Sequence, residues 1–196
     1  DRLDRVLEEI RRIVAADFHM IREVNDYLLL IPGKLFRPTL VLLANEVGGE
    51  SHEDAVTFGA TVELVHLATL VHDDAVDNSV LRRGKPTVNA LWTHQIAIIM
   101  GDYLYSRALT ELARVRRLEA IEILGDAANI MSVGEMRQLT AYDALDFSEE
   151  DYYRLISAKT ASLMKAACEM GASLGNPEHQ KALGVYGHAL GMAFQV

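Results

Sequence analysis

The sequence predicts an all-α protein, and three observations carry that prediction. Apolar residues recur at helical spacing, as at Leu3, Leu7, Ile10 and Val14, and this repeat marks the buried face of a helix. No segment shows the sustained alternation, rich in Val, Ile and Thr, that is typical of a strand. Because half of the residues are apolar, we expect the helices to pack as a bundle with buried central members.

Eight helices are expected in chain order, and several have a start or stop signal. Pro32-Gly33 stops the second helix, and Gly48-Gly49 ends the third. Residues 82–87 are expected to form a loop, and residues 143–147 a turn. The expected helices cover residues 3–14, 18–31, 35–47, 52–77, 88–114, 118–141, 148–174 and 177–196.

Two serines precede expected helices at the spacing of a capping box, in which a Ser side chain and an acidic residue three positions later cap a helix start. These pairs are Ser51 with Asp54 and Ser148 with Asp151. We expect each pair to open the helix that follows it.

Length, charge and cysteine content exclude several classes of protein. The 196 residues suit one domain. A net charge of −9 argues against a nucleic-acid binder, which needs a basic face. A single cysteine, Cys168, cannot pair within the chain, so we expect a buried core thiol. No uncharged stretch is long enough to span a membrane and the N-terminus resembles no signal peptide, so a cytoplasmic location is the default.

One apolar segment carries acidic residues that its surroundings do not favour. Residues 62–77 should lie inside the bundle, yet they include Asp73, Asp74 and Asp77. Asp73 and Asp77 are four residues apart and share a helix face, and His66 lies two turns earlier on the same stripe. Close, desolvated carboxylates repel one another, and a hard cation such as Mg²⁺ relieves that repulsion. The alternative is a solvated helix end.

Basic residues follow and precede this acidic segment. Arg82 and Arg83 come five residues after Asp77, and Lys34 and Arg37 stand at the expected start of another helix. A helix start with free N–H groups and two cations can bind an anion. Carboxylates, Mg²⁺ and arginines together indicate a diphosphate site, because one arginine can donate two parallel hydrogen bonds to phosphate oxygens. Alone, each basic pair could equally be solvated surface charge.

Several short motifs occur in a set order, and together they resemble the trans-type polyprenyl diphosphate synthases. The resemblance covers residues 26–196. It rests on the segments at residues 33–38 (GKLFRP), 63–77 (ending in DDAVD), 81–87 (LRRGKPT), 101–104 (GDYL), Gly134-Glu135 with Gln138, Lys159-Thr160 and Phe194-Gln195.

The resemblance implies a fold and an activity. The fold is an isoprenoid-synthase-type helical bundle around a central cavity. The activity is a head-to-tail condensation of isopentenyl diphosphate with an allylic diphosphate, giving a longer trans-polyprenyl diphosphate. The resemblance also implies a homodimer. Alternatives are a non-catalytic subunit of a heteromeric synthase, a short-chain farnesyl or geranylgeranyl synthase, and a terpene cyclase, although a cyclase should lack the isopentenyl site.

The resemblance also implies roles for individual residues. Asp73, Asp74 and Asp77 match the motif that holds Mg²⁺ on the allylic diphosphate, the first and last usually as direct ligands. With Arg82 and Lys159 they form the expected catalytic set. Positions that match the isopentenyl diphosphate site are Lys34, Arg37, His66 and Arg83, and those that match the allylic site are Arg82, Lys159, Thr160 and Gln195.

Two small residues bear on product length. In this family a bulky aromatic residue four or five positions before the first aspartate closes the product tunnel early. Those positions hold Ala68 and Thr69, so we expect a deep tunnel and a product longer than farnesyl. Small residues that merely allow tight helix packing are the alternative.

The chain stops at Val196, just where the family's second aspartate-rich motif would begin. We therefore expect one all-α synthase domain over residues 1–196 that is incomplete at its C-terminus, with the second set of Mg²⁺ ligands lying beyond it.

Overall fold

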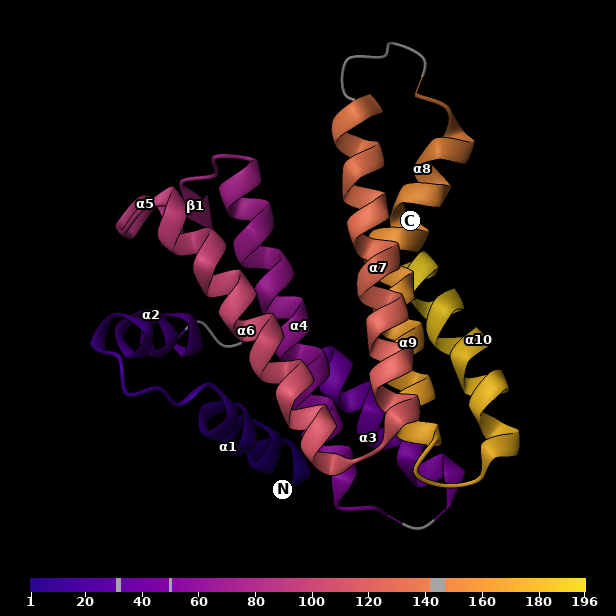
Figure 1. Ribbon diagram of the computed structural model, residues 1–196. Coiled ribbons are helices and arrows are strands. Elements are labelled where there is room, and N and C mark those ends of the chain that lie inside the picture. Colours follow the sequence, from indigo (N-terminus) through magenta and orange to yellow (C-terminus); the bar gives the residue numbers. More distant parts are fainter. Residues whose placement is uncertain (31–32, 50, 142–146) are drawn as a thin grey trace.

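The computed structural model describes residues 1–30, 33–49, 51–141 and 147–196, and it confirms the all-α prediction. Figure 1 shows two groups of helices that diverge from a common base near α3, one with α1, α2, α4 and α6 and the other with α7 to α10. The helices are α1 (Arg2–Val14), α2 (His19–Leu29), α3 (Phe36–Gly48), α4 (Asp54–Val76), α5 (Val88–Leu91), α6 (His94–Val115), α7 (Leu118–Ala141), α8 (Glu149–Ile156), α9 (Ser162–Ala172) and α10 (Pro177–Gln195).

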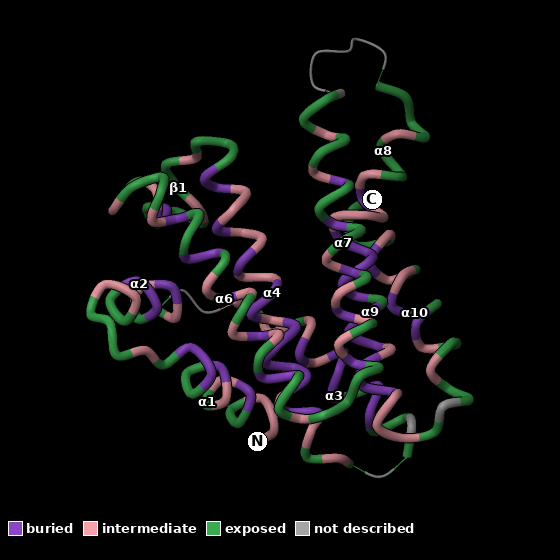
Figure 2. Tube along the Cα trace, viewed as in Figure 1, coloured by how far each residue is buried: buried purple, intermediate pink, exposed green. Residues whose placement is uncertain are grey.

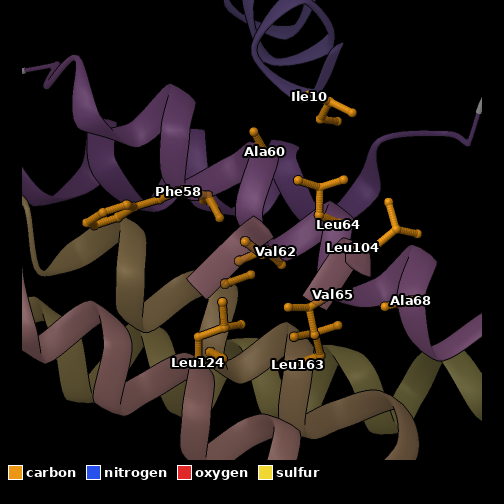
Figure 3. Packing of buried hydrophobic residues seen from close by; sticks show 14 of the residues in the cluster. Ile10, Phe58, Ala60, Val62, Leu64, Val65, Ala68, Leu104, Leu124 and Leu163 are labelled. Carbon is orange, nitrogen blue, oxygen red and sulfur yellow. The ribbon is translucent and has the colours of Figure 1, made fainter. Parts of the chain in front are cut away.

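Helix α4 lies at the centre of the core. It contacts α1, α3, α5, α6, α7 and α9, and its buried side chains meet Ile10 of α1, Leu104 of α6 and Leu163 of α9 within one apolar cluster (Figure 3). Figure 2 shows buried residues along α4 and α9, whereas α8 is mostly exposed. Removal of this apolar surface from water is the main driving force for burying α4.

The length and composition of α4 correct one expectation. The helix is long and apolar enough to cross a membrane, contrary to the prediction that no segment would be, but 61% of the qualifying window is buried inside the protein. Core helices of globular proteins also pass this test, and the packing of α4 on six other helices accounts for its apolar sequence.

Three expected features of the chain are wrong in detail. The helix expected over 88–114 is split, because Thr93 is extended and caps α6 through the N–H of Ile96. The helix expected over 148–174 contains a π-helical segment, Ser157–Ala161, between α8 and α9. Helix α4 starts after Glu53 without a side-chain cap, so the Ser51 capping box does not form.

Other boundaries are confirmed. Ser148 and Asp151 form the expected capping box at α8, and α3 ends at Gly48 with Gly49 in a positive-φ conformation. Cys168 is a buried free thiol, and burial raises its pKa to about 12. The stop at Pro32 and most of the turn expected at residues 143–147 lie outside the described residues.

The expected loop at residues 82–87 contains a small hairpin instead. Strands β1 (Leu81–Arg82) and β2 (Lys85–Pro86) pair antiparallel. The two residues between them, Arg83 and Gly84, both have positive φ values, 50° and 74°, as in the type I′ turns that suit tight hairpins. The hairpin therefore places Arg82 in β1 and Arg83 in the turn, shortly after the end of α4.

Candidate active site

Helix α4 borders two cavities with different lining residues. A cavity of about 160 Å³ is lined by Gly33, Glu63, His66, Asp74, Arg82 and Arg83, together with apolar residues. A larger cavity of about 720 Å³ lies between α4, α6 and α7 and is lined by Ala68, Thr69, Asp73, Glu135 and Lys159, among others. His66 and Asp73, which their spacing places on one stripe, therefore line different cavities. Eight of the predicted site residues divide equally between these two spaces.

Lys159 is the cation of the larger cavity. Its Nζ pairs with the carboxylate of Glu135 on α7 and donates a hydrogen bond to Oε1 of Gln138 at 2.9 Å. It lies 3.9 Å from Oδ2 of Asp73 on α4. The π-helical segment carries Lys159, and such single-turn bulges inside α-helices redirect side chains and are frequent at functional sites. Lys159 thus links α4, α7 and the π-helical segment.

The surroundings of Asp73 disfavour the ionised form of its carboxyl group. Burial, and then the negative charge of Glu135, raise the pKa of Asp73 to about 6, with Lys159 opposing and Asp77 adding to the rise. Its side chain keeps 24% exposure on the cavity side. A carboxylate held in this way gains from any added positive charge in the cavity.

Asp74 has a different partner. Its side chain is only 9% exposed, and Oδ2 accepts a hydrogen bond from Nε of Arg82 at 2.8 Å. The carboxylate therefore anchors the hairpin arginine to the last turn of α4. Charge–charge attraction from Asp74, Asp73 and Asp77 adds to this bond in raising the pKa of Arg82.

The smaller cavity collects positive charge around one buried carboxylate. Burial raises the pKa of Glu63, and Arg37 and Arg83 oppose that rise. Within the described residues, Oε2 of Glu63 and Nε of Arg37 are buried without a hydrogen-bond partner. Burial, then Arg37, Arg83 and Arg82, lower the pKa of His66 to about 3, so His66 is neutral at physiological pH. These residues form a pocket with more positive than negative charge that suits an anion.

Four other predicted residues, Thr160, Gln195, Asp77 and Lys34, line neither cavity. Nε2 of Gln195, at the end of α10, donates to Oγ1 of Thr160 at 2.9 Å, which joins two residues predicted for one site. Asp77 follows the end of α4 and is exposed, and Lys34 is exposed just before α3. The structure brings neither Lys34 nor Asp77 into a direct ion pair among the residues it describes.

The sequence motifs assign no role to three residues that the structure places at the two cavities or in contact with Lys159, namely Glu135, Gln138 and Glu63. Glu135 and Gln138 hold Lys159, and the spacing Gly134-Glu135-x-x-Gln138 was the available signal. Glu63 lines the smaller cavity, and only its place one turn before His66 indicated it. Across the described parts of the chain, no three His, Cys, Asp or Glu side chains converge closely enough to hold a metal ion.

Comparison with known proteins decides the family. The family model described as Polyprenyl synthetase matches residues 18–196. The chain belongs to the polyprenyl synthetase family. It is 36% identical over 193 residues to the octaprenyl diphosphate synthase of Escherichia coli (strain K12), covering 97% of this chain and 58% of that protein. It is 37% identical over 198 residues to heptaprenyl diphosphate synthase component 2 of Geobacillus stearothermophilus, covering 100% and 62%.

Solved structures of family members share the fold. A decaprenyl diphosphate synthase from Rhodobacter capsulatus superposes with a TM-score of 0.94 at 40% identity, over 99% of this chain and 61% of that one. A polyprenyl synthase from Caulobacter crescentus CB15, complexed with calcium and isoprenyl diphosphate, gives 0.95 at 34% identity, over 99% and 60%. The chain thus spans about three fifths of the length of these relatives.

The pKa of Asp73 predicts a pH-dependent stability. Its ordinary value is 3.8 and its folded value about 6, so the folded protein holds a proton that the unfolded chain releases. The stability from this proton is present below about pH 4 and is lost as the pH rises through about 6. The Asp73→Asn substitution should therefore gain about 1–2 kcal/mol over wild type between about pH 4 and 7, after allowing for solvent screening.

Denaturant unfolding of the full-length protein at several pH values, without divalent cations, measures this difference. Glu135→Gln serves as the comparison, because removal of the neighbouring negative charge should move the wild-type transition to lower pH. A stability difference between wild type and Asp73→Asn that does not change with pH would contradict the assignment.

Proposed function

We propose that the full-length protein is a head-to-tail prenyltransferase that joins isopentenyl diphosphate to an allylic diphosphate and gives a longer trans-polyprenyl diphosphate. The single observation that carries this proposal is the division of charge about the end of α4. Two adjoining cavities each combine carboxylate and cationic side chains, and one of them continues into an apolar space. Two diphosphates and one growing hydrocarbon chain need such an arrangement. The named synthases among the relatives support the same activity.

The acidic end of α4 fits Mg²⁺ as a cofactor. Asp73 and Asp77 offer hard oxygen ligands, and the raised pKa of Asp73 indicates a carboxylate short of positive charge. Asp74 is paired with Arg82, so Asp73 and Asp77 are the residues that would hold the ion, together with diphosphate oxygens. When bound, Mg²⁺ supplies charge that stabilises the departing diphosphate. A structure of a relative with calcium and isoprenyl diphosphate supports this pairing.

The allylic diphosphate is proposed to lie at the larger cavity. Lys159 lines this cavity, and Arg82 lines the smaller cavity at the same end of α4. Both would neutralise the charge that grows on the diphosphate oxygens as the allylic C–O bond breaks and the electron pair leaves with the diphosphate. Thr160 and Gln195, which are hydrogen-bonded to each other, would line the same site. The apolar cavity wall would keep water from the carbocation.

Isopentenyl diphosphate is proposed to bind at the smaller cavity. The positive charges of Arg83 and Arg37 act on Glu63 there, and neutral His66 can donate a hydrogen bond to a phosphate oxygen. Lys34 is exposed just before α3, and it would add a further positive charge. Binding there would aim the double bond at the carbocation, form the new C–C bond and release a proton to the freed diphosphate. The protein's contribution is the position of two anions.

Incubation of the full-length protein with Mg²⁺, isopentenyl diphosphate and several allylic primers, followed by sizing of the products, tests this function. We expect Mg²⁺-dependent prenyl diphosphates. Cyclic hydrocarbons would indicate a terpene cyclase instead, and no product with any primer would indicate a non-catalytic subunit. That last alternative gains interest because one relative is named component 2 of a heptaprenyl diphosphate synthase.

The larger cavity is proposed to hold the growing chain. Ala68 and Thr69 line it one turn before Asp73, so their small size leaves the path open and supports a product longer than farnesyl. Replacement of either residue by Phe should shorten the main product by at least one isoprene unit, because the ring would close that path. Thr69→Val, which keeps the volume, should not change product length. An unchanged product in both Phe variants would defeat the proposal.

We propose that the full-length protein forms a homodimer in the cytoplasm. Helix α6 exposes Ile98 and Ile99, and α7 exposes Ile130, Val133 and Met136, and such apolar surface is a common sign of an interface. The buried, unpaired Cys168 is compatible with a reducing compartment. The mass of the purified protein in solution distinguishes a homodimer from a monomer that needs a different partner chain.

A further inference from the structure

His72, the residue before Asp73, is held by α6 in a way that requires a glycine. Its imidazole lies so close to Gly101 that a Cβ placed there would be 2.2 Å from Nε2 and 2.4 Å from Cδ2. Atoms that are not bonded do not approach so closely, so α6 accepts the ring only because position 101 has no side chain. The Gly101-Asp102 pair belongs to a motif to which the proposed reaction assigns no role.

Two oxygens of α6 fix the orientation of the His72 ring. Nε2 lies 3.1 Å from the carbonyl oxygen of Ile98 and 3.3 Å from Oδ1 of Asp102. A carbonyl oxygen can only accept, so Nε2 carries a hydrogen and donates it. Because Ile98 and Asp102 are one turn apart on α6, the ring is fixed in height as well as in direction.

The backbone of the last turn of α4 is already capped, so side chains are left to set its orientation. Helix α4 ends at Val76, and the N–H groups of Asp77 and Ser79 donate to the carbonyl oxygens of Asp73 and Asp74. Asp73 and Val76 face the larger cavity, so that side of the turn has little packing. Side-chain contacts orient this turn, namely Asp74 with Arg82 of the hairpin, Asp73 with Lys159, and His72 with α6.

We propose that His72, Gly101, Asp102 and the Ile98 carbonyl form a latch between α4 and α6 that sets the rotation of the last turn of α4 and thereby aims Asp73 at the larger cavity. His72 is then a positioning residue, and its role in the reaction rests on the function proposed above. A helix turns by about 100° per residue. A rotation that carries His72 off Gly101 therefore carries Asp73 away from Lys159, which lies 3.9 Å from it.

A double-mutant cycle in the full-length protein tests the latch. Gly101→Ala should lower kcat at least tenfold, because the added methyl group expels the imidazole. In the His72→Ala variant the added methyl group has room. Gly101→Ala should therefore lower kcat by less than threefold relative to His72→Ala alone. Unfolding free energies measured in EDTA should show the same lack of additivity, which reports direct contact between the two positions without any metal or substrate.

Further variants separate positioning from plain loss of structure. In each variant kcat should fall by a larger factor than the KM for isopentenyl diphosphate rises, because Gly33, Glu63 and His66 of the smaller cavity lie outside the last turn of α4. His72→Gln, whose amide can donate near the Nε2 position, should recover most of the activity that His72→Ala loses. Asp102→Ala should lower kcat, and Asp126→Ala, which removes an exposed carboxylate of α7 that lines neither cavity, should not.

Three results would overturn the latch. These are additive effects of Gly101→Ala and His72→Ala on the unfolding free energy, wild-type kcat in both single variants, and no recovery in His72→Gln. If wild type itself forms no prenyl diphosphate, the proposed function fails, and the unfolding cycle in EDTA still decides whether the latch exists.

Discussion

The placement of carboxylates at the end of a buried apolar helix is the constraint on which the rest of the site depends. Helix α4 is central to the core. Near its end it carries Asp73, whose pKa is raised by burial and by Glu135, and Asp74, which is paired with Arg82. A desolvated carboxylate is unfavourable without a counter-charge. The hairpin supplies one for Asp74 through Arg82, and the π-helical segment supplies Lys159 near Asp73.

These two counter-charges differ in strength, and the difference suggests how the site works. The Asp74–Arg82 pair is short, at 2.8 Å, and its carboxylate is nearly buried, so it acts as a fixed part of the scaffold. Lys159 stands farther from Asp73 and is held by Glu135 and Gln138. Asp73 is therefore left with less positive charge than it needs. A cation that enters the cavity with a diphosphate would meet that need, which is how an acidic protein can bind acidic ligands.

The sequence predicted the helices and the family well, because both depend on local signals. Periodic apolar residues placed α1, α4 and α7, and motif order indicated the family that the comparisons confirmed. The π-helical segment and the type I′ turn at Arg83-Gly84 could not be predicted in this way. A π-bulge depends on tertiary contacts, and Arg-Gly is a weak signal for that turn.

The sequence predicted the site only in part. It named Asp73, Lys159 and the hairpin arginines, but it could not distinguish Asp74 as the partner of Arg82, since adjacent aspartates look alike in a motif. It also could not reveal that Glu135 raises the pKa of Asp73, or that His72 rests on Gly101. These contacts join residues far apart in the chain, and only the packing of α4 against α6 and α7 brings them together.

The most direct test of this account is calorimetric titration of the full-length protein with an allylic diphosphate analogue whose C–O bond cannot break. The titration is done once in the presence of Mg²⁺ and once in the presence of EDTA. The account predicts that Mg²⁺ strengthens binding at least tenfold in wild type and less than twofold when Asp73 and Asp77 are both changed to Asn. Equal affinity with Mg²⁺ and with EDTA in wild type would contradict it, because the acidic end of α4 would then need no cation to accept a diphosphate.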